Sequence, residues 1–128
     1  MNDLQFTIEV LLATYNGEQF IREQLDSLIN QSYTDFKILI RDDGSTDNTL
    51  QIINEYQQKY PTKISIIKDN KKNVGATQNF GILLNNTNDD YVFFCDQDDI
   101  WLPNKIEVSI QKMKLLEQEN KAIPCLIF

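Results

Sequence analysis

The residues that decide the expected fold are Tyr91-Val92-Phe93-Phe94-Cys95-Asp96-Gln97-Asp98-Asp99. The first five form a short apolar run with aromatic and β-branched side chains, which is typical of a strand buried on both faces of a sheet. Three carboxylates follow within four residues. We therefore expect a buried strand that ends in an acidic loop, with a helix beginning near Pro103.

Along the rest of the chain, segments with a continuous apolar run alternate with segments whose apolar residues recur at helical spacing. Strands are also predicted at residues 6–13, 36–40 and 64–68, with a fifth beginning at 123–128. Helices are predicted between them, at residues 20–29, 47–60, 76–86 and 103–117. This alternation predicts an α/β fold with a mainly parallel sheet, flanked by helices that make right-handed crossovers.

Ligands of such folds bind at the carboxyl ends of the strands. Three polar breaks in the sequence fall at such ends: residues 14–16, 42–45 and 96–99. Because parallel strands end at the same edge of a sheet, we expect these segments to form one site.

The composition limits what the site can bind. A net charge of −7 without a basic stripe argues against a nucleic-acid partner. With no histidine in the chain, a metal site would have to be oxygen-rich, and a general base would have to be a carboxylate or another group. No membrane span or signal peptide is expected. Cys95 is interpreted as a core residue without a structural disulfide to Cys125, as in a reducing cytosol.

Asp96 and Asp98 are predicted metal ligands. In an extended segment, residues two apart lie on the same side, so both carboxylates could bind one cation. Mg²⁺ commonly uses one or two carboxylates together with water and the phosphates of its ligand. A cation would also allow an acidic protein to hold a phosphorylated molecule. The simpler interpretation is a solvated acidic loop.

Two other uses of this spacing are weighed against the metal site. A calcium loop of the EF-hand type would need an oxygen ligand and a glycine where Ile100 and Trp101 stand. A haloacid-dehalogenase-like phosphatase would use Asp96 as its nucleophile. That family expects Thr or Val at the position of Asp99, and it carries the motif on its first strand. The phosphatase is kept as an alternative.

Two earlier segments also suit a nucleotide. Asp42 and Asp43 can accept hydrogen bonds from the imide of uracil or thymine, or from ribose hydroxyls, although a turn alone would explain them. The segment from Asn73 to Ala76 opens a predicted helix and resembles an anion site. Lys71 and Lys72 beside it are interpreted mainly as a solvated face, and Trp101 is interpreted as a core residue rather than a sugar platform.

Taken together, these residues resemble the family 2 glycosyltransferases with the Rossmann-like GT-A fold. The resemblance extends from Ile8 to about Met113, and the Asp-Gln-Asp-Asp-Ile-Trp form looks most like the bacterial rhamnosyltransferase-like members. The motifs that carry it are residues 14–16, Gln31-Ser32-Tyr33-Thr34-Asp35-Phe36, residues 41–47, Asn73-x-Gly75, Asn79-Phe80 and residues 96–103.

The resemblance implies a role for individual residues. Asp43 matches the acid that recognises the pyrimidine, with Asp42 beside it. Asp96 matches an acid near the ribose and the metal, and Asp98 a direct ligand of Mg²⁺ or Mn²⁺. The other matched positions line the base or lie near the nucleotide: Ala13, Thr14, Tyr15, Asn73 and Asn79. The chain departs from the family pattern at Gln78, where an arginine is usual, and near Ala13, where a proline is more frequent.

The implied function is inverting transfer of a sugar from a UDP- or dTDP-linked donor to a glycan or lipid-linked acceptor, in bacterial cell-surface polysaccharide synthesis. Residues 1–128 would be the nucleotide-sugar-binding part, with the acceptor side missing and the catalytic base beyond residue 128. The fragment alone is therefore expected to be inactive. A non-catalytic nucleotide-sugar-binding module is the other alternative. The expected location is cytoplasmic, with contact to the inner face of the plasma membrane only through regions outside these residues.

Overall fold

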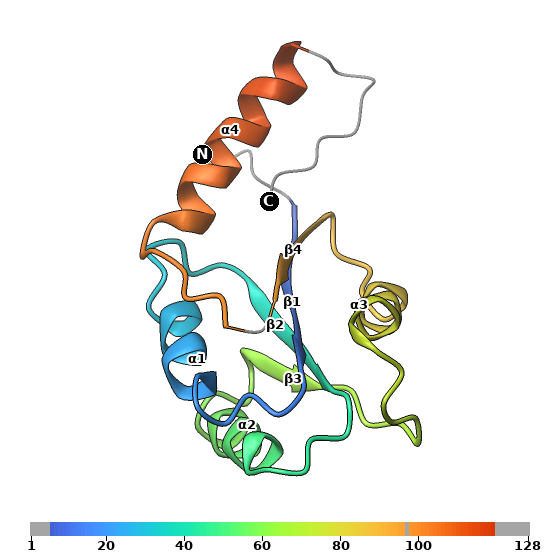
Figure 1. The fold of residues 1–128 in the computed structure, drawn as a ribbon. Helices are drawn as coiled ribbons and strands as arrows, with labels where there is room; N and C mark the ends of the chain where they lie inside the picture. The colour runs from blue at the N-terminus through green and yellow to red at the C-terminus, as the bar shows by residue number, and fades with distance from the viewer. Residues whose placement is uncertain (1–5, 97, 120–128) are drawn as a thin grey trace.

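The structure, a computed structural model, describes residues 6–96 and 98–119. Four parallel strands form one sheet in the order β3-β2-β1-β4 (Figure 1). The parallel α/β architecture expected from the sequence is confirmed. The strands are β1 (Ile8–Thr14), β2 (Lys37–Asp42), β3 (Ile64–Ile66) and β4 (Tyr91–Cys95).

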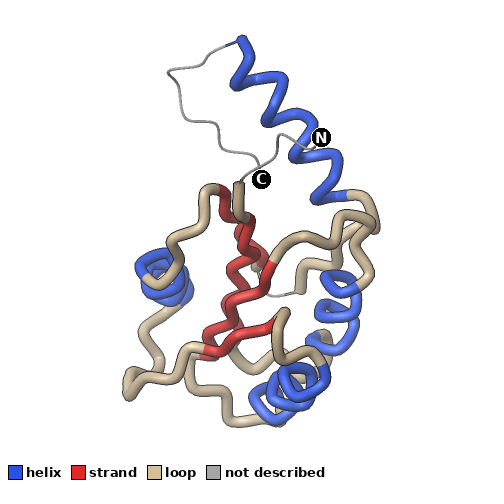
Figure 2. Tube along the Cα trace, turned by 180° about the vertical axis from the view of Figure 1, so that it is seen from behind, coloured by secondary structure: helices blue, strands red, loops and turns tan. Residues whose placement is uncertain are grey.

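Four helices connect or follow these strands: α1 (Ile21–Ile29), α2 (Thr49–Lys59), α3 (Ala76–Asn85) and α4 (Lys105–Glu119). Each predicted helix is present, although α2 and α4 begin two residues later than expected. Helix α3 covers one face of the sheet, and α1 and α2 cover the other (Figure 2). The predicted strand at 123–128, and Cys125 within it, lie outside the described residues.

Strand β1 lies at the centre of the sheet because it is apolar on both sides. All seven of its residues are buried. Val10 and Leu12 belong to the larger hydrophobic core with α1, α2 and the start of α4, while Leu11 and Ala13 pack with Leu83 of α3 in the smaller core on the opposite face. A continuous apolar run is therefore satisfied by helices on both faces.

The register of the strands brings the predicted site together. Ala13 pairs with Arg41 and Thr14 with Asp42, while Leu12 pairs with Cys95. The loops after β1, β2 and β4 consequently begin at nearly the same level of one sheet edge.

Two expectations about buried and membrane-spanning segments can be compared with the structure. Cys95 is a buried thiol, and burial raises its pKa to about 12, as fits a core residue. Within residues 6–96 and 98–119, no helix is both long and apolar enough to span a membrane.

Candidate functional site

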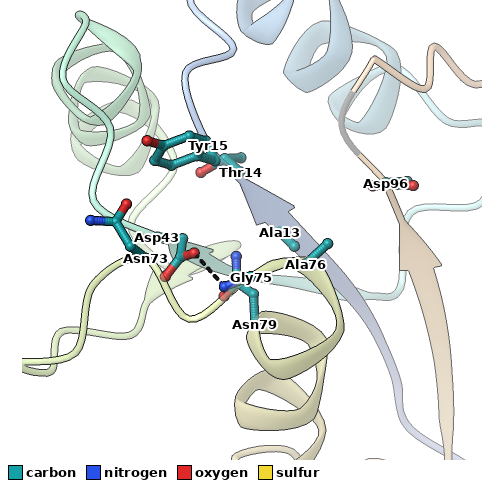
Figure 3. A pocket seen from close by; sticks show the side chains of 9 residues that line it. All are labelled: Ala13, Thr14, Tyr15, Asp43, Asn73, Gly75, Ala76, Asn79 and Asp96. Atoms are coloured by element: carbon teal, nitrogen blue, oxygen red, sulfur yellow. Dashed lines mark hydrogen bonds between the residues drawn. The ribbon is translucent and has the colours of Figure 1, made fainter.

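A cavity of about 430 Å³ opens at the carboxyl ends of β1, β2 and β4, beside the start of α3 (Figure 3). All of the predicted substrate-binding residues except Asp42 line it, so the structure brings together segments far apart in sequence. Gly75 and Ala76 line it as well; the sequence predicted that they open a helix and belong to a segment resembling an anion site, but it did not name them as site residues. The lining residues are Ala13, Thr14, Tyr15, Asp43, Asn73, Gly75, Ala76, Asn79 and Asp96.

Asp43 is the most constrained acid of the cavity and is only 4% exposed. Its carboxylate accepts hydrogen bonds from the backbone N–H groups of Val74 and Gly75, both at 3.0 Å, and from Nη1 of Arg41 at 3.3 Å. Burial alone would raise the pKa of Asp43, but the two N–H groups and the guanidinium outweigh it, and the pKa is lowered. Asp43 is thus an ionised anchor for the segment that enters α3.

This contact changes the interpretation of residues 73–76 as an anion site. Gly75 has a positive φ of 93°, which allows the backbone to bend into α3. The N–H groups of Val74 and Gly75 point to Asp43, so an internal carboxylate already receives the donors that a phosphate could have used. Lys71 and Lys72 do not line the cavity, in agreement with their interpretation as a solvated face.

Arg41 holds a buried network beneath the cavity, and its side chain is 1% exposed. Its Nε and Nη2 donate to the two carboxylate oxygens of Asp69 at 3.0 and 2.9 Å, a bidentate pair. Its Nη1 donates to Oδ1 of Asn79 at 2.9 Å, and Nδ2 of Asn79 donates back to the carbonyl of Arg41 at 3.2 Å. Arg41 therefore fixes Asp43, Asn79 and the loop before α3 together.

Neither Arg41 nor Asp69 was predicted as a site residue. The sequence did place Arg41, a charged residue, at the end of an apolar strand. A charge buried there needs an ion pair or hydrogen bonds, and this was the one indication of its role. Nothing in the sequence near Asp69 pointed to Arg41, because the two are separated by 28 positions.

Asp42 has a different place from its neighbour. Its carboxylate accepts from Oγ1 of Thr14 at 2.7 Å, from the N–H groups of Gly44 and Ser45, and from Oγ of Ser45 at 2.6 Å. These bonds close the turn after β2 and tie it to β1. Because side chains alternate along a strand, one acid of the pair faces the buried arginine and the other forms the turn. Asp42 lies outside the lining of the cavity.

The loop after β1 forms another wall of the cavity. Tyr15 is 42% exposed and lines the cavity beside Thr14 (Figure 3). Asn16, with a positive φ of 49°, accepts from the N–H of Thr46 at 2.8 Å, and its own N–H donates to Oγ of Ser45 at 2.7 Å. The loops after β1 and β2 are therefore bonded to one another.

The acidic segment is a turn rather than an extended strand. The N–H of Asp99 donates to the carbonyl of Asp96, while the Asp99 carboxylate accepts from the N–H of Asp96, both at 3.2 Å. Asp98 has a positive φ of 74°. The expectation that Asp96 and Asp98 share a side of an extended segment is therefore wrong, because β4 ends at Cys95, Asp98 has a left-handed backbone and Asp99 bonds back to Asp96.

Asp96 and Asp98 are nevertheless both exposed, and Asp96 lines the cavity on the side opposite Asp43 (Figure 3). Residues 6–96 and 98–119 contain no group of three or more acidic or sulfur side chains that could bind a metal alone. Two carboxylate ligands suit Mg²⁺ or Mn²⁺ when a bound molecule supplies phosphate oxygens and water completes the sphere. The donor set therefore fits a cation that arrives with a phosphorylated ligand.

Trp101 comes two residues after Asp99 and belongs to the core, as predicted. It is 7% exposed, and its ring lies 5.9 Å from that of Phe93. The glutamates further along are also engaged: Glu107 accepts from Oγ of Ser32, and Glu117 from the hydroxyl of Tyr91, each at 2.7 Å. Neither glutamate lines the cavity.

Comparison with known proteins reveals a consistent similarity. The model of the family "Glycosyl transferase family 2" matches residues 9–123. The dTDP-rhamnosyl transferase RfbG of Shigella flexneri is 45% identical over 120 residues, which are 91% of this chain and 37% of that protein. The poly(ribitol-phosphate) β-N-acetylglucosaminyltransferase TarS of Staphylococcus aureus is 38% identical over 92 residues, 70% of this chain and 16% of that protein.

Solved structures show the same fold. TarS residues 1–349 in complex with UDP superpose with a TM-score of 0.75 at 27% identity, covering 85% of this chain and 32% of that one. The Pyrobaculum calidifontis mannosyltransferase PcManGT, in complex with GDP-Man and Mn²⁺, gives a TM-score of 0.76 at 19% identity, covering 85% of this chain and 32% of that one. The chain thus spans between 16% and 37% of the length of these relatives.

Proposed function

This chain belongs to glycosyl transferase family 2, and on that premise we propose that it is the donor-binding part of an enzyme that transfers a sugar from a nucleoside-diphosphate sugar. The observation that carries the proposal is the cavity at the carboxyl ends of β1, β2 and β4. It has the position at which α/β folds bind nucleotides, and it joins segments that the sequence had marked separately.

Asp43 and the loop after β1 are proposed to bind the base. An ionised carboxylate can accept the imide N–H that uracil and thymine share, and Tyr15 offers an exposed ring beside it. Ala13 and Thr14 would complete this end, with Asn73 and Asn79 near the nucleotide. Two relatives support a pyrimidine: one is a dTDP-rhamnosyl transferase, and TarS was crystallised with UDP.

The acidic turn, by which we mean Asp96 and residues 98–102, is proposed to bind the diphosphate end. Asp96 and Asp98 would hold a Mg²⁺ or Mn²⁺ ion, which supplies charge neutralisation for the departing nucleoside diphosphate. Asp96 lines the cavity, and Asp98, two residues later, is exposed. Both side chains are therefore accessible to solvent. The protein's part is to hold the donor so that its anomeric carbon faces an acceptor.

The complete reaction is proposed to be an inverting single displacement. The acceptor oxygen attacks the anomeric carbon, the bond to the diphosphate breaks, and a base takes the acceptor proton. Glu107 and Glu117 lie outside the cavity and are bonded to other side chains, so neither suits this task. We place the base beyond residue 128 and regard this chain as the part that binds the donor.

The acceptor is proposed to be a glycan or a lipid-linked glycan of a bacterial cell-surface polysaccharide. The printed activities of the relatives support this, since a poly(ribitol-phosphate) β-N-acetylglucosaminyltransferase and a poly(ribitol-phosphate) β-glucosyltransferase both match more than two thirds of the chain. The enzyme would act in the cytoplasm, with peripheral contact to the inner face of the plasma membrane where the acceptor is a lipid. Fractionation of cells that express the complete protein tests this location.

Family membership removes the support for an aspartyl phosphatase. A non-catalytic nucleotide-sugar-binding module remains distinguishable by experiment. The test of the proposed function is metal-dependent binding of UDP or dTDP by the complete protein, followed by an assay of sugar transfer. Binding without any turnover of the sugar nucleotide would identify a binding module, and no binding at all would contradict the proposal.

A further inference from the structure

Helix α1 lies beside the segment after β4 (Figure 1). Polar side chains of α1 and of the residues just after it bond to that segment. Gln24, Ser27 and Gln31 are spaced three and four residues apart, which places them in one row along the helix and its end. We name these three residues the polar stripe. Gln24 is 1% exposed and Gln31 is 3% exposed, positions at which a core helix normally carries apolar side chains.

The first contact of the polar stripe is with the beginning of the acidic turn. Nε2 of Gln24 donates to the carbonyl oxygen of Asp96 at 2.5 Å and lies 3.4 Å from Sγ of Cys95. A buried amide therefore holds the main chain at the point where β4 ends and the acidic turn begins.

The remaining contacts continue along the same segment. Oγ of Ser27 accepts from the N–H of Trp101 at 3.1 Å. Nε2 of Gln31 donates to the carbonyl of Leu102 at 2.7 Å, and its Oε1 accepts from the N–H of Ile106 at 3.1 Å. The polar stripe thus bonds to the backbone at both ends of the acidic turn and at the start of α4.

We propose that the polar stripe positions the acidic turn for metal and diphosphate binding, with Gln24 as the residue that fixes the main chain of Asp96. The inference rests on the proposed function of the cavity. The polar stripe contacts no atom of the expected donor, because none of its residues lines the cavity. Its members are positioning residues rather than catalytic ones.

The pattern of bonds favours this role over simple satisfaction of buried polar groups. Ser27 and Gln31 do bond within the helix, to the carbonyls of Gln24 and Ser27. Each member also bonds to the backbone of the same segment after β4, and apolar side chains in their place would leave those backbone groups without these partners. Metal sites depend on groups that orient their ligands, and the polar stripe bonds to the main chain that carries Asp96.

The experiment compares two ligands in the complete protein by titration calorimetry. UDP carries the diphosphate that the acidic turn would bind, whereas uridine tests only the base end. The Gln24→Met substitution keeps the length of the side chain and removes the donor. We expect it to reduce the gain in UDP affinity caused by Mg²⁺ about tenfold, while the affinity for uridine stays within about twofold of wild type.

Gln58→Met is the matched control, because Gln58 is exposed on α2 and the chemical change is the same. Ser27→Ala is a second and milder variant, expected to reduce the Mg²⁺ gain about threefold, for the case in which thermal unfolding shows that Gln24→Met does not fold. If wild type gains affinity with Mg²⁺ and the folded variants keep that gain, the inference is overturned and the proposed function stands. An equal loss for UDP and uridine would also overturn it. A wild type that binds neither ligand would instead contradict the proposed function.

Discussion

The carboxylate of Asp43 lies 3.3 Å from Nη1 of Arg41, two residues earlier on β2, and both side chains are almost completely buried. The same guanidinium forms a bidentate pair with Asp69 from the far side. This three-residue arrangement connects the end of β2, the loop before α3 and the wall of the cavity. Changes to these residues should therefore affect both the stability of the fold and the binding of a ligand in the cavity.

Replacing Arg41 by lysine is expected to destabilise the protein by about 3 kcal/mol, because a lysine cannot replace the forked contacts and leaves buried acceptors without partners. Urea unfolding measures the change. The matched control is Arg22→Lys, whose partner Glu55 is about half exposed, and where less than about 1 kcal/mol is expected. An equal decrease in the free energy of unfolding at the two positions would contradict the conclusion that the buried bonds of Arg41 stabilise this part of the fold.

The pH dependence of stability should report on Asp43. Its pKa is lower in the folded protein than the ordinary value of 3.8, so folding favours the ionised form. The stabilisation is present above that value and is lost as the pH falls below it. Asp43→Asn should cost about 2 kcal/mol at pH 7, and this difference from wild type should shrink at pH 3. Urea unfolding of both proteins at each pH provides the measurement, and a difference that grows on acidification would contradict the account.

Replacing glycine by alanine should have opposite effects on stability in the turn after β2 and within α3. Gly44 has a φ of 93°, and an added Cβ would lie 3.1 Å from Cβ of Lys72. Gly44→Ala should therefore lower the free energy of unfolding by about 1 to 2 kcal/mol. Gly81 lies within α3 with open space around it, and Gly81→Ala should raise stability by about 0.5 to 1 kcal/mol. Thermal unfolding of the two variants tests the sign of each effect, which should be opposite.

The sequence was sufficient for the sheet because its signals are local. Strand β1 is an uninterrupted apolar run, and the alternation with helices leaves few topologies other than a parallel sheet. The convergence of Thr14, Asp43 and Asp96 on one edge followed from that topology without knowledge of any side chain. The parts that depend on strand direction and crossover were thus predictable.

What the sequence could not give were contacts between distant side chains. The pairing of Arg41 with Asp69 and the bonds from Gln24 to Asp96 join segments separated by 28 and 72 positions. Asp43 lines the cavity whereas Asp42 closes the turn after β2, and this difference depends on the side of the chain to which each side chain points at the end of β2. The left-handed conformation of Asp98 is a local feature, but it contradicts the extended geometry that the spacing suggested.

The measurement that tests the central claim most directly is binding of UDP and dTDP to the complete protein, by calorimetry with Mg²⁺ or Mn²⁺ and again with a chelator. Wild type should bind at least one nucleotide, with affinity about tenfold higher in the presence of metal. Asp98→Ala should lose that gain, whereas Asp35→Ala, an exposed carboxylate in the loop before β2, should keep it. A wild-type protein that binds neither nucleotide under either condition would contradict the account.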